Sequence, residues 1–143
     1  MLPEFDENGN LPPGIHHASF KEVVERFGKK SLKRQTLTKN LDTFYDFIKD
    51  FATEIYIDGS FTTNKLAPDD VDLLVILTPD FLSQSSVIRD KLRRFVTFKK
   101  VYQLHIFAFI PGRHDQDIQK MISWFTEDRS LNSKGIVYVE IGQ

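Results

Sequence analysis

The segment that most constrains the fold of this chain is VDLLVIL at residues 71–77, in which Asp72 is the one polar side chain. A short apolar run of this kind is typical of a strand that is buried on both faces of a sheet. Helices have to cover such a sheet, because its apolar faces are unstable in water. The run therefore predicts a β-sheet with helices packed against it.

Three further segments have the apolar and β-branched composition of strands, at residues 54–58, 101–110 and 136–141. Four segments repeat apolar residues at the spacing of a helix face, at residues 19–27, about 35–51, 88–96 and 118–125. Ser19 and Glu22 have the spacing of a capping box at a helix start. We expect an α+β (α/β) fold in which a mixed sheet of about four strands is covered by helices.

The 143 residues are enough for one domain. Residues 1–18 are rich in proline, glycine, asparagine and histidine, and Pro12 and Pro13 exclude a helix there. We expect an extended N-terminal arm over residues 1–18 and a single domain over residues 19–143.

The composition excludes several classes of protein. The chain has no cysteine, which excludes a disulfide framework, a thiolate zinc site and a cysteine nucleophile. Its N-terminal stretch lacks the basic start and apolar core of a signal peptide, and no apolar run approaches the ~18 residues of a membrane span. We expect a cytoplasmic protein with no membrane partner.

The formal net charge is −1, which is less basic than a general nucleic-acid coat requires. Two local basic clusters nevertheless occur. The first contains Lys29, Lys30, Lys33, Arg34 and Lys39, and the second contains Arg89, Lys91, Arg93, Arg94, Lys99 and Lys100. Each cluster is either a solvated face, which is the usual role of a charge run, or a surface for phosphates.

The residues that carry chemistry surround the apolar strand. Asp69, Asp70 and Asp72 fall within four positions at its start, and Asp70 and Asp72 share one face because side chains alternate along a strand. A buried carboxylate needs hydrogen bonds or a cation, and two adjacent carboxylates repel each other unless a proton or a metal lies between them. A divalent ion with open positions for substrate phosphates suits this arrangement.

Gly59 and Ser60 follow the strand expected at residues 54–58. A Gly-Ser turn carries little side-chain bulk, so its N–H groups and hydroxyl can approach a phosphate. The alternative is a plain turn. What distinguishes this segment is the order strand, Gly-Ser, nine residues, Asp-x-Asp and strand.

That order resembles the DNA polymerase beta-like nucleotidyltransferase superfamily. The matching residues are Ile57-Asp58-Gly59-Ser60 and Asp70-Val71-Asp72-Leu73, with Asp58 standing where the family has an apolar residue. The length resembles the minimal stand-alone members, which consist of the catalytic palm. The beginning and end of the chain also resemble a little-characterised family of short bacterial and phage proteins within the superfamily.

The resemblance implies that Gly59 and Ser60 contact the phosphates of an NTP and that Asp70 and Asp72 ligate Mg²⁺ (or Mn²⁺). It implies the in-line attack of an acceptor hydroxyl on the α-phosphorus, with pyrophosphate as the leaving group. The acceptor is an RNA, a protein or a small molecule, and a protein partner encoded nearby can supply specificity.

The superfamily draws a third carboxylate from a later strand, and residues 101–110 contain no acid. His105 is the titratable side chain there that can serve as a base, and the alternative is a hydrogen-bonded core histidine. Asp117, Glu127 and Asp128 are other candidates that the sequence does not place. Lys134 can reach a phosphate, and Trp124 is either a stacking platform for a base or part of a helix interface.

Three functions follow as hypotheses. The first is an active nucleotidyltransferase. The second is a catalytically weak relative that binds a nucleotide or a partner protein, similar to the antitoxin half of a toxin–antitoxin module. The third is an RNA-binding module that uses the two basic clusters and needs no metal.

Overall fold

The computed structural model describes residues 1–126 and 134–141. One sheet holds its five strands, which are β1 (Gly14–His17), β2 (Ala52–Asp58), β3 (Val71–Leu77), β4 (Leu104–Phe109) and β5 (Gly135–Glu140). Their spatial order is β1-β5-β2-β3-β4. β2 is antiparallel to both of its neighbours, whereas β3 and β4 are parallel, so the sheet is mixed as expected.

The fifth strand is a difference from the expected four. β1 comes from the segment expected to be an extended arm, and it pairs in parallel with β5, with Ile15 opposite Ile136. Leu11, just before β1, is almost fully buried. The periodicity of four residues is too short to reveal such an edge strand, because pairing with β5 rather than local pattern stabilises it.

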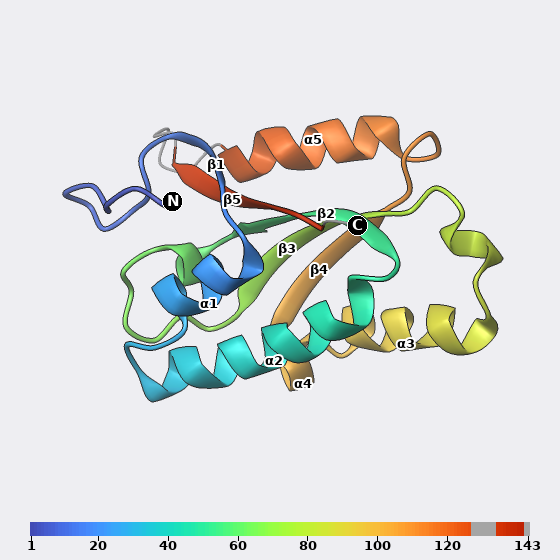
Figure 1. Ribbon diagram of the computed structural model, residues 1–143, viewed down its shortest axis with the longest axis horizontal. Helices are drawn as coiled ribbons and strands as arrows, with labels where there is room; N and C mark the ends of the chain where they lie inside the picture. The colour runs from blue at the N-terminus through green and yellow to red at the C-terminus, as the bar shows by residue number, and fades with distance from the viewer. Residues whose placement is uncertain (127–133, 142–143) are drawn as a thin grey trace.

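Helices cover both faces of the sheet (Figure 1). They are α1 (Phe20–Phe27), α2 (Leu32–Ile48), α3 (Ser86–Thr97), α4 (Lys99–Tyr102) and α5 (Asp115–Thr126). Residues of α1, α2 and α3 share one hydrophobic cluster with Leu73 and Val75 of β3. Residues of α5 share the other cluster with Leu74 and Ile76. The apolar strand is therefore buried on both faces, as its sequence predicts.

Several helix starts follow from serine caps. The Ser19 hydroxyl accepts a hydrogen bond from the Glu22 N–H at 3.1 Å, and Ser85 caps α3 in the same way. α2 begins earlier than the expected residue 35, because the Ser31 hydroxyl accepts from the Arg34 N–H at 3.1 Å. None of the helices in the described ranges is long and apolar enough to cross a bilayer.

The start of β4 differs from the sequence prediction. The expected strand over residues 101–110 begins only at Leu104, because residues 99–102 form the short helix α4. Gln103 ends that helix with φ of 58°, a left-handed conformation that is uncommon outside glycine. His105, Phe107 and Phe109 alternate along β4 and so share one face. Val101 and Gln103 lie before the start of the strand.

Candidate functional site

Three polar side chains form a row across the sheet. Asp58 at the end of β2 lies opposite Asp72 near the start of β3, and Asp72 lies opposite His105 near the start of β4. Directly opposite residues on paired strands point to the same face, with their Cβ atoms about 5 Å apart. The row continues the α5 side of the sheet, where Leu74 and Phe107 lie.

Asp72 occupies a partly enclosed position in this row. Its side chain is 24% exposed, and its Oδ1 lies 3.4 Å from His105 Nδ1. Burial raises the pKa of Asp72, and the negative charge of Asp70 raises that pKa further. A proton or another cation is therefore favoured at Asp72.

Asp58 is the residue of the site whose role the sequence reasoning missed. Its side chain is only 7% exposed, and its Oδ1 lies 3.1 Å from Lys134 Nζ, just before β5. Within the described residues that Oδ1 makes no well-aligned hydrogen bond, so the Lys134 contact is an ion pair. Burial raises the pKa of Asp58, while Lys134 and a hydrogen bond from the Gly59 backbone oppose the rise. The sequence signal for this role is the acid at position 58, where the nucleotidyltransferase superfamily that the motif resembles has an apolar residue.

The raised pKa values predict a pH dependence of stability. A carboxyl group with a raised folded-state pKa stabilises the fold fully below its ordinary pKa, and that contribution is lost as the pH rises through the raised value. In EDTA, we expect the unfolding free energy of wild type to fall relative to Asp72→Asn as the pH rises from about 4 towards neutrality. Urea unfolding at several pH values measures this difference, and parallel curves for the two proteins contradict it.

Gly59 packs against the Asp72 carboxylate. Its backbone has φ of 85° and ψ of −168°, a region that is essentially confined to glycine. A Cβ atom at this position would lie 2.6 Å from Asp72 Oδ2. The glycine therefore allows both the sharp turn after β2 and the close approach of the turn to the carboxylate.

We expect Gly59→Ala to destabilise the protein by about 1–3 kcal/mol through backbone strain and to displace the Asp72 carboxylate. Gly112→Ala is the matched control, because Gly112 has φ of 82° but open space where the Cβ would lie. Urea unfolding measures the strain in both variants. A lower affinity for divalent cations is expected in Gly59→Ala alone, because only there is the Asp72 carboxylate displaced. An equal affinity in both variants would show that Gly59 does not position that carboxylate.

Arg34 fixes the loop that follows Gly59. This residue belongs to the first basic cluster, yet it is 2% exposed and so is neither a solvated nor a phosphate-binding side chain. Its guanidinium uses all five N–H donors on backbone carbonyls, which belong to Phe27, Ser60, Phe61, Thr63 and Lys65. Burial lowers the pKa of Arg34. The bond from Arg34 to the Ser60 carbonyl holds Ser60 at the turn. The Ser60 hydroxyl donates no hydrogen bond to any of the described residues.

Asp70 borders a pocket on the β4 side of Asp72. The pocket has a volume of about 410 Å³. It is lined by Lys33, Asp69, Asp70, Lys99, Lys100, Gln103 and His105. Three residues of the two basic clusters thus meet two of the three acids of the sequence motif. Asp69 is exposed, and Asp70 is half-buried.

The comparison with protein families matches residues 3–140 to one family. The chain belongs to the DUF6932 family. This is a family of unknown function, and no curated protein and no solved structure matches the chain. The DUF6932 match includes the three residues of the row, and it also includes Lys134.

The acidic side chains of this DUF6932 chain bear on whether it can hold a divalent metal. Among the described residues, no three histidine or acidic side chains are spaced to enclose a metal ion. Mg²⁺, however, is commonly held by one or two carboxylates together with substrate phosphates and water. The buried, poorly satisfied Asp58 Oδ1 and the crowded Asp72 leave negative charge that Lys134 alone does not balance. The negative charge of Asp70 raises the pKa of Asp72, so the two carboxylates interact, and a cation between them would relieve that repulsion.

The remaining candidate residues are not members of the row, and two of them lie outside the described residues. Asp117 is exposed in the first turn of α5, and Glu127 and Asp128 lie outside the described residues. Trp124 is 45% exposed and contacts Phe107 edge-on, with ring centroids 6.4 Å apart. Lys134 contacts Asp58 rather than open solvent.

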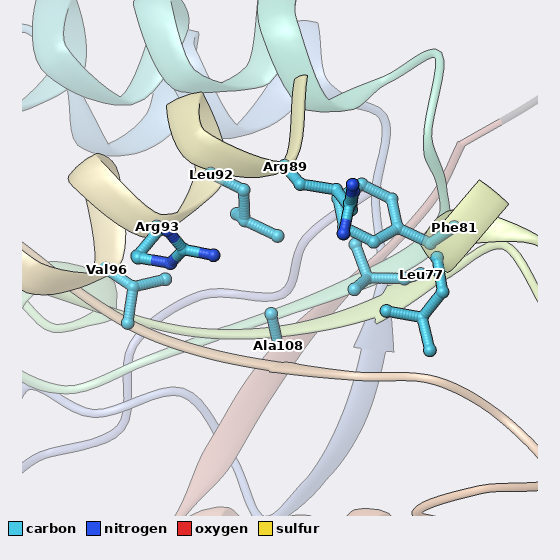
Figure 2. Close-up of a pocket in the computed structure, with 8 residues that line it drawn as sticks. Leu77, Phe81, Arg89, Leu92, Arg93, Val96 and Ala108 are labelled. Carbon is cyan, nitrogen blue, oxygen red and sulfur yellow. The ribbon is translucent and has the colours of Figure 1, made fainter. Parts of the chain in front are cut away.

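A second groove in this DUF6932 domain lies at the other end of β3. Its volume is about 310 Å³, and α3, β4 and the segment after β3 line it. Figure 2 shows Leu92 of α3 directed towards Ala108 of β4, with Arg89 and Arg93 beside them. None of the sequence-predicted site residues lines this groove, so it is separate from the acidic row.

Proposed function

We propose that this protein is a metal-dependent nucleotidyltransferase with a palm-like domain. The single observation that carries the proposal is the packing of Gly59 against Asp72. Two parts of one sequence motif, separated by nine residues, are there in contact. This contact supports a common site for phosphate and metal more strongly than a plain turn, which needs no carboxylate beside it.

In the proposed reaction, the Gly59 turn and the Ser60 hydroxyl bind phosphates of an NTP. Asp70 and Asp72 hold Mg²⁺ or Mn²⁺, which when bound neutralises charge on the reacting phosphate. Asp58 and Lys134 support the site through their ion pair, which fixes the end of β2 beside Asp72. Positioning and charge neutralisation account for most of the catalysis in phosphoryl transfer.

The acceptor hydroxyl oxygen forms a bond to the α-phosphorus, and the bond from that phosphorus to pyrophosphate breaks. The hydroxyl proton goes to a base, for which His105 is the candidate because its Nδ1 lies 3.4 Å from Asp72 Oδ1. A positioned histidine side chain is the group that most often serves as a general base in enzymes. The products are an acceptor carrying a nucleoside monophosphate and free pyrophosphate.

The test is pyrophosphate release from each of the four NTPs in the presence of Mg²⁺ or Mn²⁺ and a cell-derived RNA or protein fraction. Metal-dependent release with transfer of label from an α-labelled NTP to the acceptor supports the proposal. If NTP neither binds nor turns over with any metal, the proposal is wrong.

A catalytically weak relative, similar to the antitoxin half of a two-gene module, is the second candidate. It is favoured by one observation, which is that β4 contributes a histidine and no acid to the row. NTP affinity and turnover measured on the same sample separate the two candidates. Binding without pyrophosphate release supports the weak relative, and robust release excludes it.

A further inference from the structure

The pocket beside Asp70 is lined by three lysines as well as by two acids. Lys33 reaches it from the first turn of α2, and Lys99 and Lys100 reach it from α4. Within the described parts of the chain, none of these three lysines forms an ion pair with a carboxylate. Asp69 and Asp70 line the same pocket but do not satisfy the lysines. The three lysines outnumber the two acids, and a hollow with a net positive lining attracts a negatively charged ligand.

The backbone that places Lys99 and Lys100 there is unusual. Gln103 is the one non-glycine residue with a positive φ among the described residues. Its N–H donates to the Lys99 carbonyl at 2.7 Å, and its carbonyl accepts from the Val71 N–H at 3.1 Å. Gln103 therefore ties α4 to the start of β3, next to Asp70 and Asp72. Strained residues held by such contacts concentrate at functional sites.

The pocket and the Gly59 turn lie on opposite sides of Asp72. The turn follows β2, the pocket adjoins β4, and β3 lies between these two strands. An NTP bound at the turn leaves the pocket open to the other reactant. The residue before the two lysines is Phe98, which is 51% exposed, and Val101 is 71% exposed. An exposed aromatic side chain beside lysines is a feature of surfaces that bind single-stranded nucleic acid, because bases stack on the ring.

We infer that this pocket binds the phosphate backbone of a single-stranded nucleic acid whose terminal hydroxyl is the acceptor. The inference rests on the proposed function, because it assigns the second substrate of that reaction. Lys33, Lys99 and Lys100 contact phosphates, and Phe98 stacks on a base. A pocket of about 410 Å³ is large enough for one nucleotide unit. The arginines of the second basic cluster lie elsewhere, since Arg89 and Arg93 line the groove of Figure 2.

The test is the binding of an end-labelled single-stranded oligoadenylate, measured by fluorescence anisotropy over a range of salt concentrations without NTP. The test variant is Lys33→Glu/Lys99→Glu/Lys100→Glu. The control is Lys29→Glu/Lys30→Glu/Arg94→Glu, which makes the same change of charge at exposed positions outside the pocket. We expect the test variant to bind at least about tenfold more weakly, with a salt slope shallower by about 2. A Lys→Gln version of the triple variant, with thermal unfolding of all variants, guards against misfolding.

The inference is overturned if the control weakens binding as much as the test variant, or if wild type binds NTP but no oligonucleotide. It is also overturned if the test variant loses NTP affinity, because the lysines would then belong to the NTP site. NTP affinity is measured separately by calorimetry. A failure of the proposed function, seen as no NTP binding by wild type, is therefore distinguishable from a failure of this inference.

Discussion

Asp72→Asn is expected to reduce nucleotidyl transfer by about 10³-fold or more, while the protein stays folded. A 10³-fold loss corresponds to about 4 kcal/mol of transition-state stabilisation. The amide has nearly the shape of the carboxylate but lacks the charge that holds a divalent cation at the reacting phosphate. Initial rates of pyrophosphate release at saturating NTP measure the loss.

The same substitution is expected to leave the unfolding free energy at neutral pH unchanged or slightly increased. Asp72 is half-buried, and its partial burial, followed by the charges of Asp70 and Asp58, raises its pKa. Removing one of three like charges relieves repulsion in the metal-free protein. Asp80→Asn is the matched control, because Asp80 is exposed and lies beyond the other end of β3. Equal losses of activity in the two variants would mean that Asp72 has no special role.

Arg34→Met is expected to destabilise the protein by about 3 kcal/mol or more. The methionine preserves most of the apolar contact but removes the hydrogen bonds to five backbone carbonyls. Of these, the Ser60 carbonyl keeps the N–H and hydroxyl donors of Thr63. Buried acceptors that lose their partner cost about 1–3 kcal/mol each, and part of that cost is recovered by relaxation or water. Urea unfolding measures the change in the unfolding free energy.

The exposed Lys30→Met is the control for Arg34→Met, since it removes a charge from the same basic cluster without a buried contact. Only the Arg34 variant is expected to weaken nucleotide binding as well, because Ser60 and Thr63 lie in the loop that the guanidinium holds. A small stability effect, equal to that of Lys30→Met, would show that the hydrogen bonds of Arg34 contribute little.

The central strands could be predicted from the sequence because continuous runs of apolar residues indicate strands that are buried on both faces. β3 has the bounds expected from VDLLVIL, and Leu74 and Ile76 are buried beyond Asp72 as expected. β4 was predicted too long, because nothing in the local pattern distinguishes a four-residue helix ended by a left-handed Gln103 from the beginning of a strand. β1 was missed because its stability comes from pairing with β5.

The site was predictable in part for a related reason. The Gly-Ser turn and the Asp pair are local motifs, so the sequence itself reveals them. The burial of Arg34 and the Asp58–Lys134 ion pair depend mainly on contacts between residues 26 to 76 positions apart, which no local pattern contains. From the sequence alone, Arg34 is therefore interpreted as one charge in a basic run. Asp58 is interpreted as a mismatch to the motif of the nucleotidyltransferase superfamily.

Gly59, Ser60, Asp70 and Asp72 are proposed to form one site for a metal and an NTP. Calorimetric titration of NTP into wild type and into Asp70→Asn/Asp72→Asn, each with Mg²⁺ and with EDTA, tests it most directly. Mg²⁺ is expected to tighten NTP binding by wild type at least about tenfold and to have no such effect on the double variant. Equal NTP affinity in all four titrations, or no binding by wild type with Mg²⁺, would contradict it.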